Sequence, residues 1–340
     1  MKGVIGLDIG GANLKASDGE HRSLSVPFHL WKQPERLPAA LQELLDRFDR
    51  CDGIVVTMTG ELSDCYATKS EGVTDILAAV THAAAGRPVG VWQTAGEFVD
   101  TEVAREFWML TAAANWHALA TWAGRIAPSG AALLIDIGST TTDIIPLIDG
   151  LPLPSGRTDL ERLQSGELVY TGVKRTPACA IASCVPFRGS PIPLATELFA
   201  TTYDMYLLTG ELPEDDADTG TADGRSATMA HARDRLGRML CADRTELTSD
   251  EIADIASNLR DTHCQRLGEA LKSVLHRHQG LCVSVLTSGE GEFLARQLVA
   301  DTPALKNATF LSLAEMLGPE HSRAACAYAL ARLGSERLVV

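Results

Sequence analysis

The first third of the chain alternates short apolar runs with stretches whose apolar residues recur at helical spacing. Residues 2–8 and 53–57 are nearly continuous apolar runs, which are typical of buried strands. That order of runs indicates a mixed sheet with helices packed against it. We expect strands at 2–8, 13–16 (before a turn at 18–19), 53–57 and 88–92, and helices at 38–48, 74–85 and 111–124.

The same organisation begins again at residue 131. Residues 131–138 pass from apolar positions into an acid and a glycine, and residues 141–147 form a return strand before a turn at 149–150. Residues 155–188, which are rich in Gly, Pro, Thr and Arg, are predicted to be mostly loop. The remaining pattern predicts a strand at 282–286 and helices at 193–209, 226–241, 249–279, 291–300 and 322–333.

A self-comparison of the sequence shows an internal repeat, in which residues 6–15 align with residues 134–143 at a constant offset. Each copy has Asp-Ile-Gly after an apolar strand. A glycine turn lets backbone N–H groups approach an oxyanion, and Ser or Thr hydroxyls add donors. One Asp-x-Gly is common in ordinary hairpin turns, but its duplication favours a pair of phosphate-binding loops. The candidate phosphate-binding residues are Gly10, Gly11, Asn13, Lys15, Gly138, Ser139, Thr140, Thr141 and Thr142.

Asp8 and Asp136 end the two repeated strands. Mg²⁺ prefers a few carboxylates together with waters and substrate phosphates, so these two aspartates are candidates to hold Mg²⁺ directly or through water. Two such loops facing each other would hold a di- or triphosphate. Lys15 either reaches back to a phosphate from the return strand or is an ordinary solvated strand residue.

A third element lies at residues 285–293, where a strand leads through a glycine-rich turn into a helix. Helix N-termini attract anions, although most strand-glycine-helix junctions are structural. In this order the three elements resemble the acetate and sugar kinase, Hsp70 and actin superfamily. Nucleotide-binding members usually place two adjacent glycines beside the base, whereas this chain has Glu290 between Gly289 and Gly291. That acid argues against ATP as a ligand.

The superfamily resemblance covers nearly the whole chain and implies an α/β fold. It implies two ribonuclease-H-like domains of the actin and hexokinase type, with mixed sheets and an interdomain cleft. The implied domains are residues 1–128 and residues 129–321, the second with a substrate insertion. A C-terminal helix within residues 322–340 would pack back on the first domain.

Within that superfamily the chain most resembles the hydantoinase/oxoprolinase-related branch, which is linked to one-carbon metabolism. The residues that carry this resemblance are 6–15, 56–64, 114–116, 135–143, 167–173 and 175–177. The best understood members are methanofuran-pathway synthases, which join an (aminomethyl)furanmethyl diphosphate to the phenol of a tyramine or γ-glutamyltyramine unit and release pyrophosphate. The resemblance therefore implies a transferase of methanofuran or methylofuran biosynthesis.

The implied reaction assigns roles to the candidate residues. Opposed phosphate loops with Mg²⁺ would neutralise the leaving diphosphate, with Asp8 as the magnesium-associated carboxylate. A phenol, with a pKa of about 10, benefits from a general base, and Asp136 or Asp143 is the candidate. Residues 57–64 form a polar loop that would bind the amine end of a substrate or lie in solvent. The candidate substrate residues are Thr59, Asn115, Glu167, Tyr170, Arg175, Ser288, Gly289 and Glu290.

Two other functions stay open on the sequence. One is an ATP-dependent small-molecule kinase or an oxoprolinase-type hydrolase that uses the same loops, and the other is a phosphate- or nucleotide-sensing protein without turnover. The sequence contains no GK[ST] P-loop, no G-x-S-x-G elbow and no GxGxxG after the first strand.

The net charge and the cysteine content limit which binding partners and metal sites we expect. The chain has 30 Lys and Arg against 44 Asp and Glu, and its net charge of −14 repels nucleic acid. Its apolar runs are too short to span a bilayer and its start does not read as a signal peptide, so we expect a cytoplasmic protein. The 8 cysteines lack a CxxC pair and are predicted to be reduced thiols rather than zinc ligands. A phosphorylated small molecule is the expected partner, and a homo-oligomer is compatible with the sequence.

Overall fold

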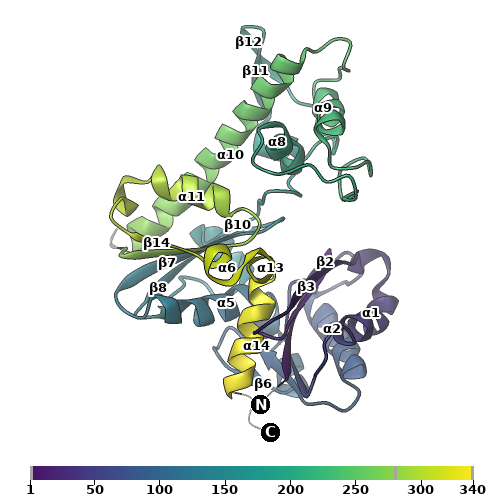
Figure 1. The fold of residues 1–340 in the computed structure, drawn as a ribbon, viewed down its shortest axis with the longest axis vertical. Coiled ribbons are helices and arrows are strands. Elements are labelled where there is room, and N and C mark those ends of the chain that lie inside the picture. The colour runs from purple at the N-terminus through teal and green to yellow at the C-terminus, as the bar shows by residue number, and fades with distance from the viewer. Residues whose placement is uncertain (1–2, 279–281, 338–340) are drawn as a thin grey trace.

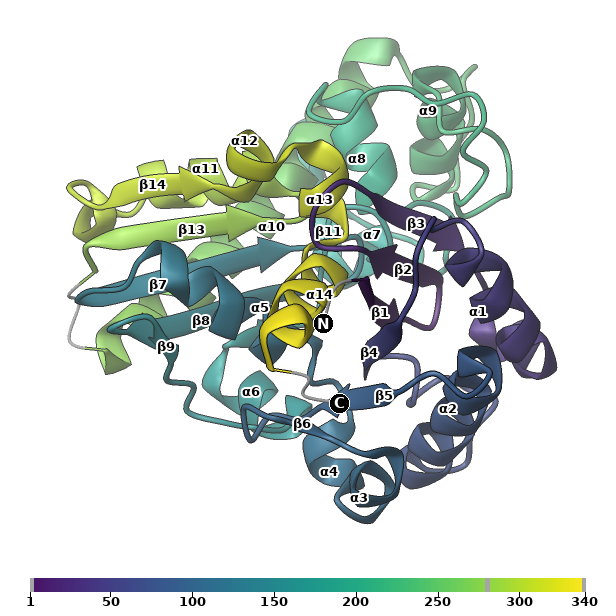
Figure 2. The ribbon, with the colours of Figure 1, turned by 60° about the horizontal axis from the view of Figure 1, so that its bottom comes forward.

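The computed structural model describes residues 3–278 and 282–337. Two mixed β-sheets lie on either side of the C-terminal helix (Figures 1 and 2). The first sheet has the order β3-β2-β1-β4-β5-β6. Its strands are β1 (Val4–Ile9), β2 (Asn13–Ser17), β3 (Ser23–Pro27), β4 (Gly53–Met58), β5 (Val89–Trp92) and β6 (Phe98–Val99).

The second sheet has the order β10-β8-β7-β13-β14, and β9 pairs with β8. In both sheets a central strand pairs antiparallel with the strand that follows it in the chain and parallel with a later strand. The strands are β7 (Ala131–Ile137), β8 (Thr142–Ile148), β9 (Leu151–Pro152), β10 (Leu168–Val169), β13 (Ser284–Ser288) and β14 (Thr309–Ser312).

Helices cover the sheets and form the insertion. In the first half they are α1 (Leu37–Leu45), α2 (Lys69–Ala84), α3 (Thr101–Glu106), α4 (Trp108–Thr111) and α5 (Asn115–Ala123). Later helices are α6 (Asp159–Ser165), α11 (Glu292–Ala300), α12 (Leu313–Leu317), α13 (Pro319–Arg323) and α14 (Ala325–Arg337). The insertion contains α7 (Ala178–Ile181), β11 (Cys184–Phe187), β12 (Ser190–Pro193), α8 (Thr202–Leu208), α9 (Met229–Arg238) and α10 (Ser249–Arg277). Short 3₁₀ helices are η1 (Leu30–Lys32), η2 (Pro34–Arg36), η3 (Gly124–Ile126) and η4 (Pro303–Leu305).

Helix α14 joins the two halves. Leu330 and Leu333 pack with Val4 and Val55 of the first sheet, while Ala329 packs with α5 and the second sheet. The helix backbone comes so close to β1 that a Cβ on Gly6 would lie 2.1 Å from the carbonyl oxygen of Ala327. The absence of a side chain at Gly6 is therefore a condition for this packing.

The structure confirms the predicted α/β fold and corrects several element boundaries. Helix α2 begins at Lys69 rather than 74, because the Thr68 hydroxyl accepts a hydrogen bond from the N–H of Glu71 and caps it. The predicted helix at 111–124 is divided where Ala113 takes a φ of +48°. The helix predicted at 193–209 is shorter and begins after Thr201, whose capping box starts α8.

Two further predictions are corrected in detail. The segment 155–188, predicted to be mostly loop, contains α6, β10, α7 and β11. The helix predicted at 322–333 is two helices, α13 and α14. The start of the first predicted strand at residue 2, residue 279 of a predicted helix and the chain end at 338–340 lie outside the described residues. Among the residues that are described, no helix is both long and apolar enough to cross a membrane.

We expect Gly6→Val to destabilise the protein by at least about 2 kcal/mol. The new side chain would collide with the backbone of α14, which cannot move aside as a flexible side chain could. Denaturant unfolding measures the effect. Gly268→Ala in α10 is the matched control, since its Cβ would make only an ordinary contact at 3.9 Å and should stabilise the helix slightly. Equal unfolding midpoints for Gly6→Val and the wild type would contradict the close α14 packing.

Candidate active site

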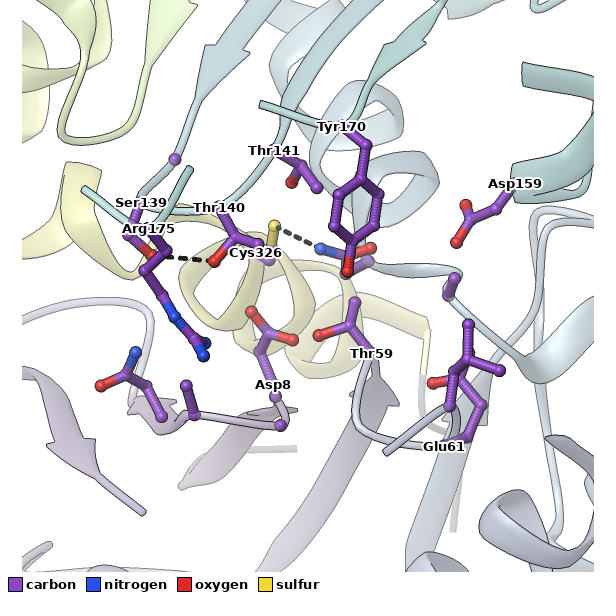
Figure 3. Close-up of a pocket in the computed structure, with 18 of the residues that line it drawn as sticks. Asp8, Thr59, Glu61, Ser139, Thr140, Thr141, Asp159, Tyr170, Arg175 and Cys326 are labelled. Carbon is purple, nitrogen blue, oxygen red and sulfur yellow. Dashed lines mark hydrogen bonds between the residues drawn. The ribbon is translucent and has the colours of Figure 1, made fainter. Parts of the chain in front are cut away.

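A cavity of about 540 Å³ lies between the two halves of the chain (Figure 3). Its size falls within the range of about 300–1,000 Å³ that is usual for small-molecule sites. It brings together most of the residues that the sequence singled out, from both repeated turns and from the segments beside them. Those residues are Asp8, Gly10, Gly11, Asn13, Lys15, Thr59, Asn115, Asp136, Gly138, Ser139, Thr140, Thr141, Asp143, Tyr170 and Arg175.

The two repeated turns share one hydrogen-bond pattern. The N–H of Gly10 donates to the carbonyl oxygen of Asn13 at 3.0 Å, and the N–H of Gly138 donates to that of Thr141 at 2.9 Å. The repeat in sequence is therefore also a repeat in backbone geometry. Both turns contribute to the wall of the same cavity, one from each half.

The two copies differ in how their aspartates are neutralised. Strand register places Asp8 opposite Lys15 in the first copy and Asp136 opposite Asp143 in the second. Burial raises the pKa of Asp8, and Lys15 offsets part of that rise. Burial and the neighbouring Asp143 raise the pKa of Asp136 to about 6, against a hydrogen bond from Ser288. The second copy thus needs a cation from outside the repeat.

Arg162, on α6, supplies that cation. Its guanidinium pairs with Asp143, lies 3.5 Å from Asp159 and stacks 4.0 Å from the ring centre of Trp116. The side chain is only 1% exposed, so its charge is compensated by these groups rather than by bulk water. The ion pair ties Asp143 to α6, while Asp136 accepts a hydrogen bond from Ser288.

Asp8 and Asp136 suit a magnesium ion that is shared with a phosphate ligand. The buried Oδ1 atom of Asp8 lacks a hydrogen-bond partner among the described residues, and such an atom is costly unless an ion or water satisfies it. Oxygen ligands from two carboxylates, completed by water and phosphate, match magnesium chemistry. In the part of the chain that the structure describes, no group of three or more His, Cys, Asp or Glu is arranged to hold a metal by itself.

One side of the cavity carries a cation beside the second turn. The carbonyl oxygen of Ser139 accepts the N–H groups of Lys174 and Arg175 at 3.0 and 2.9 Å, which fixes the Arg175 segment on that turn. The Arg175 guanidinium lies 5.5 Å from the ring centre of Trp31, a residue of the first half. Arg175 and Trp31 thereby meet across the cavity.

The opposite side is acidic. Figure 3 shows Glu61 and Asp159 together on the side of the cavity away from Arg175. Glu61 is 1% exposed, and burial is the main reason why its pKa rises to about 7, with Lys69 acting against the rise. The loop that carries Glu61 is held to the first turn because the carbonyl oxygen of Ile9 accepts the N–H groups of Thr59 and Gly60.

Five sequence candidates do not reach the cavity wall: Thr142, Glu167, Ser288, Gly289 and Glu290. Strand alternation turns Thr142 away from the face that carries Asp143, and its hydroxyl donates to the carbonyl oxygen of Thr171. The buried Glu167 accepts the N–H of Ser155.

The third motif supports the second turn instead of facing the ligand space. Ser288 donates to Asp136, and the N–H of Gly291 donates to the carbonyl oxygen of Ile137. Gly289 has a φ of +88°, and a Cβ there would lie 2.3 Å from the same oxygen. Glu290 pairs with Lys174 at 3.0 Å. These contacts account for the glycines without any ligand.

Sequence reasoning missed several wall residues, of which Trp31, Asp159, Arg162 and Cys326 carry chemically active side chains. One signal was available, because Thr158 and Glu161 form a capping box that marks the start of α6 and so of the segment with Asp159 and Arg162. Cys326, near the start of α14, comes from the other end of the chain. It accepts a hydrogen bond from Asn115 at 3.8 Å.

We expect Arg162→Met to destabilise the protein by about 3–5 kcal/mol, since it removes the ion-pair partner of the buried Asp143. Adding Asp143→Asn should recover a large part of that loss, because the uncompensated charge is then gone. Urea unfolding of the two single variants and the double variant measures the coupling. Additive effects of the two substitutions would contradict it.

Glu61→Gln should stabilise the protein increasingly as the pH rises. Burial raises the Glu61 pKa from 4.5 to about 7 in the folded state, so the unfolded chain loses this proton first and the wild type loses stability as pH rises through that interval. Glutamine cannot ionise, so its advantage above pH 7 should be on the order of 3 kcal/mol. Unfolding at several pH values tests this, with the exposed Glu43→Gln as control. A pH-independent difference would contradict the shift.

The chain is similar to known proteins over nearly its full length. Residues 52–336 match the family model described as hydantoinase/oxoprolinase. The chain is 34% identical over 339 residues, covering 98% of each protein, to the (4-{4-[2-(gamma-L-glutamylamino)ethyl]phenoxymethyl}furan-2-yl)methanamine synthase of Methanocaldococcus jannaschii. It is 32% identical over 201 residues to the synthase of the same name from Methanococcus vannielii, covering 59% of this chain and 89% of that one.

Among solved structures, a nucleotide-free acetone carboxylase has a similar fold, with a TM-score of 0.52 at 11% identity over 97% of this chain and 70% of the other. That likeness concerns the fold alone. The family match and the relative that aligns over nearly the full length are stronger and agree with each other. This chain belongs to the hydantoinase/oxoprolinase family.

Proposed function

We propose that this protein is a cytoplasmic transferase that joins a furanmethyl diphosphate to the phenol of a tyramine-type acceptor and releases pyrophosphate. The relatives' name describes a product in which a phenoxymethyl group joins a furan that carries a methanamine. The observation that carries the proposal is the cavity. Its wall combines two turns of equal backbone geometry, one from each half, with carboxylates and cationic side chains. Its volume of about 540 Å³ accommodates a furan diphosphate beside a phenol.

The charges on the wall suit a diphosphate that enters with a divalent cation. Among the described residues, six acidic side chains and three basic ones line the cavity, so a bare polyanion would be repelled. The residues that would hold Mg²⁺ are Asp8 and Asp136. When bound, the ion would neutralise charge on the phosphate oxygens.

In the proposed reaction the phenol oxygen forms a bond to the furanmethyl carbon while the bond from that carbon to the diphosphate oxygen breaks. Pyrophosphate leaves with the bonding electron pair. Lys15 and Arg175, together with the glycine turns, stabilise the charge that develops on it. The phenolic proton passes to Asp136 or Asp143, the two carboxylates of the second turn, of which Asp143 is paired with Arg162.

The position of Glu290 favours this reaction over the use of ATP. In a nucleotide-binding relative this motif would lie against the adenine, but here Glu290 is paired with Lys174, which also lies 3.7 Å from Asp218 of the insertion. Lys174 further stacks 4.8 Å from the ring centre of Tyr203. These contacts link the motif to the insertion and engage the Glu290 carboxylate in an ion pair.

The decisive assay measures pyrophosphate and phosphate release with Mg²⁺. We expect pyrophosphate from (5-(aminomethyl)furan-3-yl)methyl diphosphate only when tyramine or γ-glutamyltyramine is present, and no turnover of ATP with the same acceptor. Asp8→Asn and Asp136→Asn should lower turnover by at least about a hundredfold. Asp75→Asn, on the exposed face of α2, is the charge-matched control, and unfolding midpoints show whether each variant is folded.

Other outcomes would assign other functions. ATP turnover with an inert furan donor would make the protein a kinase or hydrolase that uses the same turns. Ligand binding without turnover of either donor would make it a sensing protein. Full activity of both folded aspartate variants would remove Asp8 and Asp136 from the reaction.

A further inference from the structure

The acidic side of the cavity is separate from the groups that the proposed reaction uses. Glu61 follows β4, and Asp159 lies in the first turn of α6, so the two carboxylates come from different halves of the chain. Figure 3 shows them on one side, with Arg175 and Ser139 on the other and Asp8 between. The cavity is therefore bipolar, with its acidic end opposite Arg175.

Glu61 is the unexplained member of this end. It is buried and lines the cavity, yet its Oε2 atom has no hydrogen-bond partner among the described residues. A buried polar atom of this kind normally has a partner in the functional state. The loop is held to the first turn and helix α2 packs on its backbone, so the carboxylate cannot simply swing into solvent.

The charges around Glu61 leave it short of a cation. Asp159 and Asp8 repel its ionised form, and Lys69 attracts it without reaching Oε2. Asp159 shares both of its cations with other carboxylates: Arg162, at 3.5 Å, also pairs with Asp143, and Lys69 also attracts Glu61. A positively charged ligand group would supply the partner that these two carboxyl groups lack.

We propose that Glu61 and Asp159 bind a primary ammonium group on the donor, so that this end of the cavity selects an aminomethylfuran over a furan without the amine. The proposal rests on the proposed function for the identity of the donor. That donor carries an ammonium at one end and a diphosphate at the other, and the cavity has the matching polarity. An ammonium offers three N–H donors, which suits carboxylates that approach from two elements.

The assignment gives Glu61 and Asp159 a role in selectivity and positioning. With the ammonium held at the acidic end and the diphosphate at the turns, the furan ring must span the middle of the cavity, where Thr59 and Tyr170 lie in Figure 3. The reacting carbon is then directed toward Asp8 and Asp136. Removing one of these carboxylates should weaken binding of the donor much more than it lowers the turnover rate of the bound donor.

Binding of simple probes tests the site without the reaction. We expect calorimetry to show that the wild type binds furan-2-ylmethanamine at least about tenfold more tightly than furan-2-ylmethanol, and that Glu61→Gln and Asp159→Asn each lose most of this preference. Glu61→Asp should keep part of it. Glu43→Gln, which removes a carboxylate from the exposed face of α1, should bind like the wild type.

The pH dependence provides a readout that a purely structural role would not move. Because burial raises the pKa of Glu61 to about 7, amine binding by the wild type should strengthen from about pH 6 to about pH 8 as this carboxyl ionises. The groups that face it are Lys69 from α2, Asp159 from α6 and Asp8 from β1. The dependence should largely disappear in Glu61→Gln.

Turnover gives the second arm. In Glu61→Gln the KM for the aminomethyl donor should rise at least about tenfold, with kcat changed less than about threefold, and the KM for a donor without the amine should stay the same. The two proposals fail separately. Selective amine binding without pyrophosphate release keeps the ammonium site and rejects the transferase. Pyrophosphate release with unchanged amine selectivity in Glu61→Gln keeps the transferase and rejects the ammonium site.

Two results overturn the ammonium site directly. One is equal binding of the amine and the alcohol by the wild type. The other is Mg²⁺ binding that depends on Glu61 in the absence of amine binding, which would assign these carboxylates to a metal.

Discussion

The cavity between the two sheets is lined by more acidic than basic side chains. The packing of the two sheets therefore depends on how these buried charges are paired. Lys15 faces Asp8 across a hairpin, and Arg162 reaches Asp143 from a helix outside the repeat. A buried charge without a partner is strongly destabilising, because nothing offsets the free energy of removing it from water. The pairing is incomplete at Asp8 and Glu61, since each has a buried carboxylate oxygen without a hydrogen-bond partner among the described residues.

Helix α14 packs against both halves of the chain, between the two sheets whose turns line the cavity. Its small residues pack on β1 at the bare backbone of Gly6 and on α5, and its first turn brings Cys326 into the cavity wall. The helix thereby connects the stability of the core with the shape of the site. The cavity that the two halves and this helix form has Arg175 on one side and Glu61 and Asp159 on the other.

The duplicated fold has been adapted unequally. The first turn keeps a lysine on its return strand, whereas the second has Asp143 and borrows its cation from α6. The third motif lies outside the cavity wall, where its glycines pack on Ile137 and its acid pairs with Lys174. The two turns thus share their backbone geometry but differ in how their carboxylates are paired.

The sequence by itself determined the local features: the two strand-turn repeats, the aspartates at their ends, and the order of elements that indicates two mixed sheets. These follow from short-range periodicity and turn chemistry, which a few neighbouring residues encode. Only the tertiary structure decided which side chains meet. Arg162, Trp31 and Cys326 reach the cavity from distant segments, and strand alternation and glycine packing take Thr142 and Gly289 away from it. Contacts of this kind depend on helix docking and sheet register, which no local pattern records.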